Sequence, residues 1–174
     1  ELTYSRPLAK DRKVFGDVVP YEKVWRTGAN MATKISFSDD VKVNGQSLPK
    51  GTYALFTIPR EKNWTIIFNQ NPNQWGTGDY KESENALVFD VNTQLLPNHI
   101  ESFNIQFNPL SNRTAEMIIS WASTAVSFNV EADIDDRIMK SIQTSLQVNP
   151  SDYYNAALYY HETGRELDKA LEWM

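Results

Sequence analysis

Apolar and polar residues alternate along most of the first 130 residues of the chain. The alternation begins at Leu2 and Tyr4 and ends at Val126, Phe128 and Val130. A period of two is typical of strands with one buried face, because successive side chains of a strand point to opposite sides. The pattern predicts a mainly β protein, an antiparallel β-sandwich of eight or nine strands. The intervening groups are Ile35/Phe37, Val41/Val43, Trp64/Ile66/Phe68, Leu87/Phe89/Val91, Phe103/Ile105/Phe107 and Met117/Ile119/Trp121.

Turn-forming residues separate these groups. Asn44-Gly45 is typical of a two-residue hairpin, because a type I′ turn needs positive φ at both central residues. Pro97-Asn98 is expected to divide the strand around Phe89 from the one around Ile105.

The apolar period changes after Val130, where three helices are predicted. The first carries Ile134, Ile138, Met139, Ile142 and Leu146 on one face and begins near Asp133 and Asp136. The second runs from Ser151, after Asn149-Pro150, to Thr163 and ends at Gly164, and the third covers 165–174. We therefore expect a β-sandwich domain over 1–130 and a helical segment over 131–174.

The last 26 residues resemble a tetratricopeptide repeat. Ala157, Tyr160 and Gly164 match the small residue, the aromatic residue and the turn glycine of that motif, and Ala170 matches with a one-residue offset. One repeat needs neighbours to bury its apolar face, so this resemblance implies a truncated array that binds a protein partner. The alternative is a helical cap on the sandwich.

Composition narrows the function classes. The net charge of −5 argues against a nucleic-acid partner, and the absence of cysteine excludes disulfides, thiolate metal sites and cysteine nucleophiles. No apolar run is long enough to cross a membrane. The chain starts inside a strand pattern and stops inside a helix pattern, so we expect a fragment whose signal peptide has been removed.

Five segments together resemble a bacterial family, domain of unknown function 2911. They are YSRP (4–7), GDVVPYEKVWRTGANMATKISFS (16–38), LPKGTYALFTIP (48–59), WTIIFN (64–69) and QWGTGDY (74–80). The resemblance covers residues 2 to 130, and VWRTGAN is its most specific part. It implies an exported protein, periplasmic or extracellular, and no particular reaction.

Arg26 is the first candidate for ligand binding. An arginine can stack on Trp25 and offer its fork of donors to a carboxylate or phosphate, and Arg6 could converge on the same anion. Gly28 and Asn30 tolerate positive φ, so successive amides there could form an anion-binding nest. The alternative is that Arg26 only pins the loop, bound by backbone carbonyls or by Asp17 or Glu22.

The loop 74–80 is the second candidate. Gln74, Trp75 and Tyr80 combine aromatic faces with polar groups, which suits a sugar or peptide ligand. The alternative is that Trp75 folds back and closes the end of the sandwich.

Chemistry for catalysis is sparse. Neither His99 nor His161 lies in a triad or metal-binding motif, so no catalytic residue, metal site or cofactor is predicted. A hydrolase would need an acid or base beside Arg26, for which Asp79 and Glu22 are the candidates.

The sequence thus favours a binding module over an enzyme. An anionic or carbohydrate ligand is expected in a cleft lined by Arg6, Trp25, Arg26, Asn30, Gln74, Trp75 and Tyr80. The alternatives are a hydrolase acting on a cell-envelope polymer and a structural scaffold for protein partners.

Overall fold

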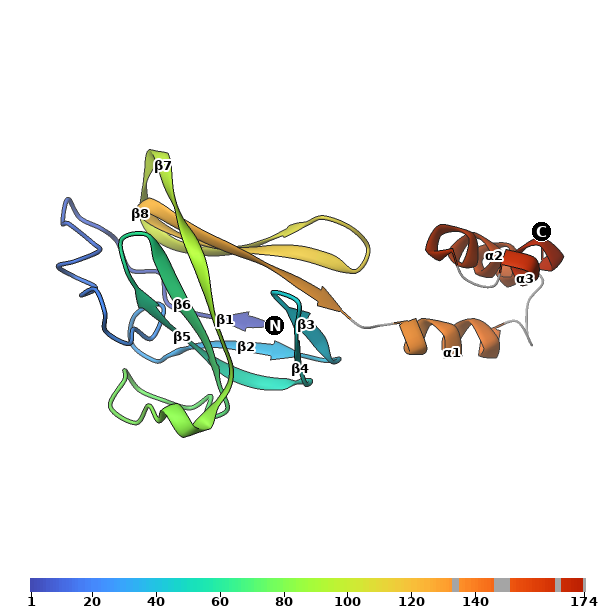
Figure 1. Cartoon of the computed structure of the whole chain (residues 1–174), viewed down its shortest axis with the longest axis horizontal. Coiled ribbons are helices and arrows are strands. Elements are labelled where there is room, and N and C mark those ends of the chain that lie inside the picture. The colour runs from blue at the N-terminus through green and yellow to red at the C-terminus, as the bar shows by residue number, and fades with distance from the viewer. Residues whose placement is uncertain (133–134, 146–150, 165–166, 174) are drawn as a thin grey trace. The chain divides into compact units, whose positions relative to one another are not determined.

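The fold is taken from a computed structural model of the chain (Figure 1), which describes residues 1–132, 135–145, 151–164 and 167–173. The chain divides into two compact units, Glu1–Asp133 and Ile134–Met174. The first is built from strands and the second from helices, so each is described by itself.

The first unit is one open antiparallel sheet of eight strands, in the order β1-β2-β5-β6-β7-β8-β3-β4. The prediction of a mainly β, antiparallel fold is confirmed, but the strands form one continuous sheet and not the two separate sheets of a sandwich. The strands are β1 (Leu2–Thr3), β2 (Thr33–Phe37), β3 (Val41–Val43), β4 (Gln46–Leu48), β5 (Gly51–Pro59), β6 (Asn63–Asn69), β7 (Asn85–Pro109) and β8 (Thr114–Ala132).

Strand β7 is the reason that the sheet is continuous. Its first part pairs with β6, as at Ile66↔Phe89, and its second part pairs with β8, as at Ile105↔Ile119. The register shifts between Leu95 and Asn104, where β7 bulges around the Pro97-Asn98 pair that was expected to end a strand. A bulge bends a strand without ending its pairing, so one long strand contributes to both halves of the sheet.

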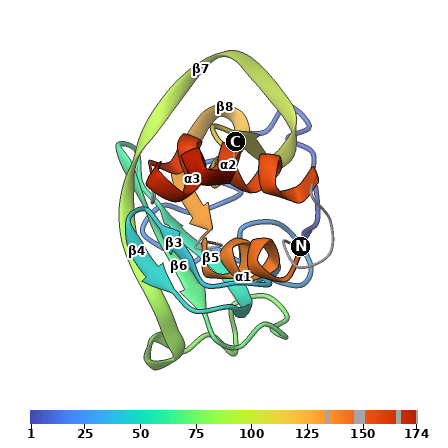
Figure 2. The same cartoon turned by 90° about the vertical axis from the view of Figure 1, so that its right-hand side faces the viewer.

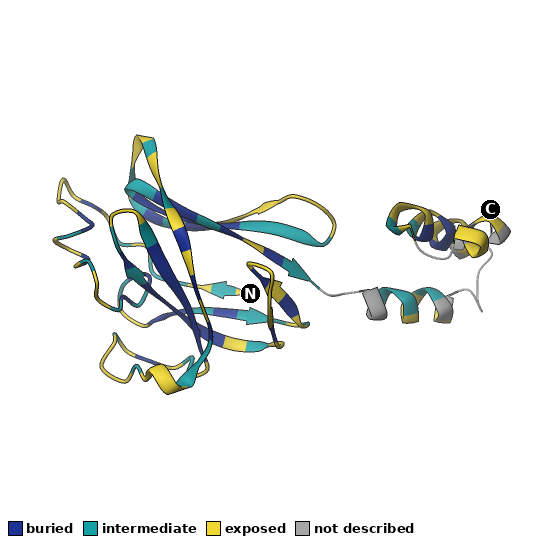
Figure 3. Cartoon of the chain, in the orientation of Figure 1, coloured by how far each residue is buried: buried dark blue, intermediate teal, exposed yellow. Residues whose placement is uncertain are grey.

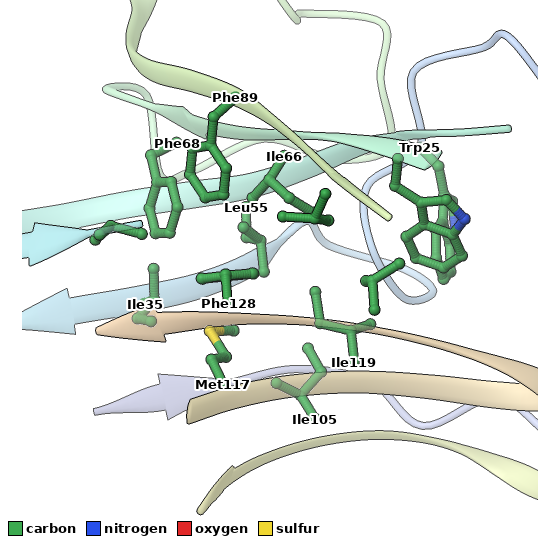
Figure 4. Close-up of a cluster of buried hydrophobic side chains, with 14 of the residues drawn as sticks. Trp25, Ile35, Leu55, Ile66, Phe68, Phe89, Ile105, Met117, Ile119 and Phe128 are labelled. Carbon is green, nitrogen blue, oxygen red and sulfur yellow. The ribbon is translucent and has the colours of Figure 1, made fainter. Parts of the chain in front are cut away.

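The two halves of the sheet enclose the main core. Figure 4 shows side chains of β2, β5, β6 and β7 on one side and of β7 and β8 on the other, pointing toward one another. Burial of one such side chain stabilises the fold by roughly 1.5–3 kcal/mol. The labelled residues are Trp25, Ile35, Leu55, Ile66, Phe68, Phe89, Ile105, Met117, Ile119 and Phe128.

A smaller cluster is buried on the outer face of β5 and β6. Ala32, Ala54, Phe56 and Ile67 form it, and Tyr80 is among the partly buried residues packed against it. The middle of both strands is therefore buried on both faces, which Figure 3 shows as dark blue stretches.

The β3–β4 hairpin confirms its sequence prediction. Val43 pairs with Gln46 across the turn, and Asn44 and Gly45 have φ values of 49° and 78°. Two successive positive φ angles are what the type I′ turn requires.

The second unit contains α1 (Asp135–Ser145), α2 (Ser151–Thr163) and α3 (Leu167–Trp173). Ala157 and Tyr160 are buried in it, and Gly164 follows α2 with a φ of 67°, as the predicted helix end requires. The helices are short, and they show no tetratricopeptide repeat. Some residues that the sequence assigns to helix ends and helix faces lie outside the described residues. They are Asp133, Ile134, Leu146, Asn149-Pro150, Arg165 and Met174. None of the helices that the structure describes is long and apolar enough to cross a bilayer.

Candidate functional site

The segment 26–32 is a loop inserted into the edge of the sheet. Trp25 forms an antiparallel bridge with Thr57, and Thr33 resumes the pairing opposite Leu55. The residues between Trp25 and Thr33 therefore loop out opposite the single residue Phe56. The Thr33 amide donates to the Arg26 carbonyl at 3.2 Å and closes the neck of this loop.

Unusual backbone angles let the loop turn tightly. Thr27, Gly28 and Asn30 have φ values of 53°, 153° and 62°. Glycine is required at 28 for a second reason, because a Cβ there would lie 3.2 Å from the Ser5 carbonyl oxygen. Thr33 Oγ1 also donates to the Thr27 carbonyl at 2.6 Å.

The loop 74–80 contacts the loop 26–32, and the sequence analysis had placed residues of both in one cleft. The Ala32 amide donates to the Gln74 carbonyl at 3.0 Å, and the Gly76 amide donates to the Asn30 carbonyl at 3.3 Å. These bonds join the two segments in a short antiparallel ribbon. A Cβ at Gly76 would lie 4.0 Å from Arg26 Nη1, so the guanidinium lies beside the ribbon.

Arg26 is half-buried, and its side chain makes no hydrogen bond or ion pair with the residues that the structure describes. Its Nε is fully buried and donates no hydrogen bond. The two acids that were considered as partners are engaged elsewhere: Asp17 lies 3.8 Å from Lys13, and Glu22 lies 2.7 Å from Arg60. A loop pinned through either acid, or through backbone carbonyls, is therefore not what the structure contains.

The loop amides are also unused. The backbone amides of residues 27–31 donate no hydrogen bond to any residue in the described part of the chain. Thr27 and Gly28 are themselves buried. Amides of buried residues are almost always paired, so the unpaired amides of these two residues are unusual, whereas Asn30 and Met31 are exposed.

The N-terminal segment, which carries Arg6, contacts the loop through a hydrogen bond between Ser5 and Asn30. Arg6 is exposed, and its Nε donates to the Phe103 carbonyl at 3.1 Å. Asn30 is exposed, and its Nδ2 donates to Ser5 Oγ at 3.4 Å. No interaction joins the guanidinium groups of Arg6 and Arg26 in the described chain.

Trp25 does not line an open cleft. It is 8% exposed and stacks on Trp121, with ring centroids 6.0 Å apart and an angle of 18° between the rings. Its Nε1 donates to the Gly28 carbonyl at 3.0 Å, so it fixes the loop from the core side. In Figure 4 its ring lies at one end of the cluster of core side chains. Trp25 therefore positions the backbone of Arg26 and does not present a face to a ligand.

The three residues chosen from the loop 74–80 separate into different environments. Trp75 is 69% exposed and does not close the end of the sheet; it pairs with Met31 across the ribbon. Gln74 is fully buried, and its amide donates to Asn69 Oδ1 at 2.9 Å. Tyr80 packs on Phe56 at 5.1 Å between ring centroids. Trp75 and Met31 share one face of the ribbon, while Gln74 belongs to the other.

Neither Glu22 nor Asp79 pairs with Arg26. Glu22 is held by Arg60, and Asp79 is exposed on the loop. His99 lies 3.4 Å from Glu101 on the surface of β7. Among the described residues no group of three His, Asp or Glu side chains could hold a metal ion. The arrangement supplies hydrogen-bond donors for an anion and no acid–base pair beside them.

A family model described as "Protein of unknown function (DUF2911)" matches residues 1–130. The chain belongs to this family. The DUF2911 region holds the Arg26 loop and all but the last residues of β8. No curated protein and no solved structure matches the chain. Membership in the family supplies no function.

The sequence did not predict a second hollow, which has both apolar and polar residues in its lining. A hollow lies where the turn between β2 and β3 meets the turn between β7 and β8, and serines, Asn112 and Thr114 are among its lining residues. The polar residues of these turns were the available signal. Their meeting depends on how the sheet bends, which a local pattern does not reveal.

Proposed function

We propose that the DUF2911 region is a binding module that holds an anionic group at Arg26. The observation that carries this proposal is the half-buried guanidinium with a buried, unpartnered Nε. Leaving a buried hydrogen-bond donor unpaired costs about 1–3 kcal/mol, so such donors are rare in folded proteins. A bound carboxylate or phosphate would remove that cost.

The surroundings suit an oxygen-rich anion. Guanidinium groups bind carboxylates and phosphates through parallel hydrogen bonds, which are stronger than bonds between neutral groups. The unpaired amides of residues 27–31 lie in the same loop and could complete a nest around the anion. A carbohydrate acid or a phosphorylated sugar fits this chemistry, and so does a peptide carboxylate.

Binding is favoured over catalysis by the groups near Arg26. Glu22 is bound to Arg60 at 2.7 Å, so it is not free to serve as a base. Asp79 is exposed on the loop 74–80. The hydrolase alternative has no such supporting observation.

Arg26→Met gives a test that separates a binding residue from a structural one. We expect this variant to unfold at a higher temperature, with roughly 1–2 kcal/mol more stability, because it replaces an unpaired cation with an apolar side chain of similar length. We also expect it to lose any stabilisation that phosphate or glucuronate gives the wild type in a thermal-shift assay.

Arg60→Met is the matched control. Arg60 is bound by Glu22 and by Thr65, so the same substitution there should lower the melting temperature and leave the ligand-induced shift intact. If Arg26→Met instead destabilises the fold as Arg60→Met does, and neither anion shifts the wild type, Arg26 is a structural residue.

The helical unit supports a second proposal, that it begins a protein-binding array. Tyr154, Leu158 and Leu171 are 60%, 44% and 79% exposed, while Ala157 and Tyr160 are buried. Exposed apolar residues are expected where a repeat lacks its neighbours. Circular dichroism of residues 134–174, alone and in a longer natural chain, tests this: helix content per residue should rise in the longer chain.

We also propose an exported location, which fractionation of cells that express the full-length protein would test.

A further inference from the structure

A hollow of about 310 Å³ lies away from Arg26, where two turns of the sheet meet. One is the turn 38–40 between β2 and β3, and the other is the turn 110–113 between β7 and β8. Its volume is at the lower end of the range for small-molecule sites. Apolar side chains in its lining include Phe37, Val41 and Val130, and polar ones include Asn112 and Thr114.

The walls of the hollow are held by hydrogen bonds within the chain. Ser111 Oγ accepts from the amides of Arg113 and Thr114, at 3.2 and 3.0 Å. The Ala132 amide donates to the Arg113 carbonyl at 2.8 Å, which ties the turn to the end of β8. A site whose walls are already fixed loses little conformational entropy when a ligand binds.

The charges at the hollow balance. Asp39 and Arg113 are its charged lining residues, with one negative and one positive charge, and both already take part in interactions within the chain. Ser38 Oγ donates to Asp39 Oδ2 at 2.8 Å. An ionic ligand would have to displace these interactions, so the site favours a neutral one.

Two neutral polar side chains in the lining are available to bind a ligand beside the apolar residues Phe37, Val41 and Val130. The Asn112 amide and the Thr114 hydroxyl make no hydrogen bond to another residue in the described part of the chain. Asn112 supplies two donors and one acceptor, and Thr114 supplies one donor and an acceptor. A sugar ring presents hydroxyls at its edge and C–H groups on its faces, so it matches both the rim and the Phe37 wall.

We propose that this hollow binds one unit of a neutral carbohydrate. The site is separate from the Arg26 loop, shares no residue with it, and does not depend on the function proposed there. Asn112 and Thr114 would bind the ring hydroxyls, and Phe37, Val41 and Val130 would contact its apolar face.

The test is an amide NMR titration of the whole chain with D-glucose and D-galactose, and with D-glucuronate as the charged counterpart. We expect a neutral sugar to shift the amides of 36–39 and 111–115 in a saturable way. Asn112→Ala/Thr114→Val should weaken that binding roughly tenfold, as loss of two hydrogen bonds implies. Asn98→Ala/Thr124→Val, made outside the hollow, should leave the affinity unchanged.

Three results would overturn the proposal. One is the absence of saturable shifts at these amides with either neutral sugar up to about 100 mM, where a millimolar site would be filled. Another is unchanged affinity in Asn112→Ala/Thr114→Val, which would place the sugar elsewhere. The third is glucuronate binding here as tightly as the neutral sugars. Shifts confined to residues 26–31 would support the Arg26 site and count against this one.

Discussion

Arg26 forms no ion pair with any acid among the residues that the structure describes. Trp25 enters the core and Arg26 follows it at the neck of a loop, where the Arg26 Nε is buried. Asp17 and Glu22 bind Lys13 and Arg60 instead. A residue that costs stability is expected to contribute something else, and binding an anion is the role that its surroundings favour.

Trp25 and Trp75 differ in burial, so substitutions at the two residues should differ in their effect on stability. Trp25→Ala should destabilise the protein by about 3–5 kcal/mol, because it leaves a cavity among Phe15, Phe103 and Trp121. Trp75→Ala should change the free energy of unfolding by less than roughly 0.5 kcal/mol, because that ring is mostly exposed. Urea denaturation followed by far-ultraviolet circular dichroism measures both. Similar losses for the two variants would contradict these positions.

The loop 26–32 is the element on which the candidate site depends. Its neck is closed by the bond from Thr33 to Arg26, and its tip is paired with residues 74–76. The two ends of the loop are thus fixed while its amides stay unpaired. This combination of a rigid frame and unused donors is what a preformed binding site requires.

Gly28→Ala tests that frame. Residue 28 has a φ of 153°, and an added Cβ would meet the Ser5 carbonyl oxygen at 3.2 Å and Thr33 Oγ1 at 3.3 Å. We expect a loss of about 1–3 kcal/mol, from backbone strain together with this contact. Gly45→Ala is a useful control, since it has a positive φ but meets nothing within 4 Å. A smaller loss at residue 28 than at residue 45 would argue against the close packing of the loop on Ser5.

The long strands explain why the sequence predicted elements better than architecture. The apolar positions shift from odd to even numbers between Trp121 and Val126, and Ala122 in β8 has a φ of 51°. A bulge causes such a shift and so does a new strand, so alternation alone could not distinguish them. The shift in β8 and the Pro97-Asn98 pair in β7 each predict a strand end, so the sequence predicts four strands and a sandwich where the structure has two long strands and one bent sheet.

The candidate site could be predicted only in part, for a related reason. Glycines and Asn30 marked both loops, and the structure brings the loops together. Trp25 points into the core because its backbone pairs with Thr57. That pairing joins distant parts of the chain, so the residues around Trp25 could not reveal it. The same limit explains why Asn112 and Thr114 were not recognised as neighbours of Phe37.

At the scale of the whole molecule, stability should fall in alkaline solution through Tyr53. Burial and then the negative charge of Asp40 raise the pKa of Tyr53 above its ordinary value of 10.0. Below pH 10 both states hold a neutral tyrosine. Above pH 10 the unfolded state loses its proton first, so stability decreases until the pKa of the folded state is passed.

Tyr53→Phe isolates this contribution from those of the other tyrosines. The variant should be less stable at neutral pH by about 1 kcal/mol, because it loses the 2.7 Å hydrogen bond to the Pro49 carbonyl. Its stability should then decline less steeply above pH 10 than that of the wild type. Urea denaturation at several pH values measures both slopes, and parallel slopes would contradict the raised pKa.

The measurement that tests the central claim most directly is the NMR signal of the Arg26 Nε–H during titration with inorganic phosphate and with glucuronate. The structure leaves this donor buried and unpartnered, so a bound anion should shift it strongly. We predict that this signal and the amides of residues 27–31 shift together with one dissociation constant, while the Nε–H of Arg60 stays in place. If neither anion moves the Arg26 signal, or if it moves no more than that of Arg60, the anion site does not exist.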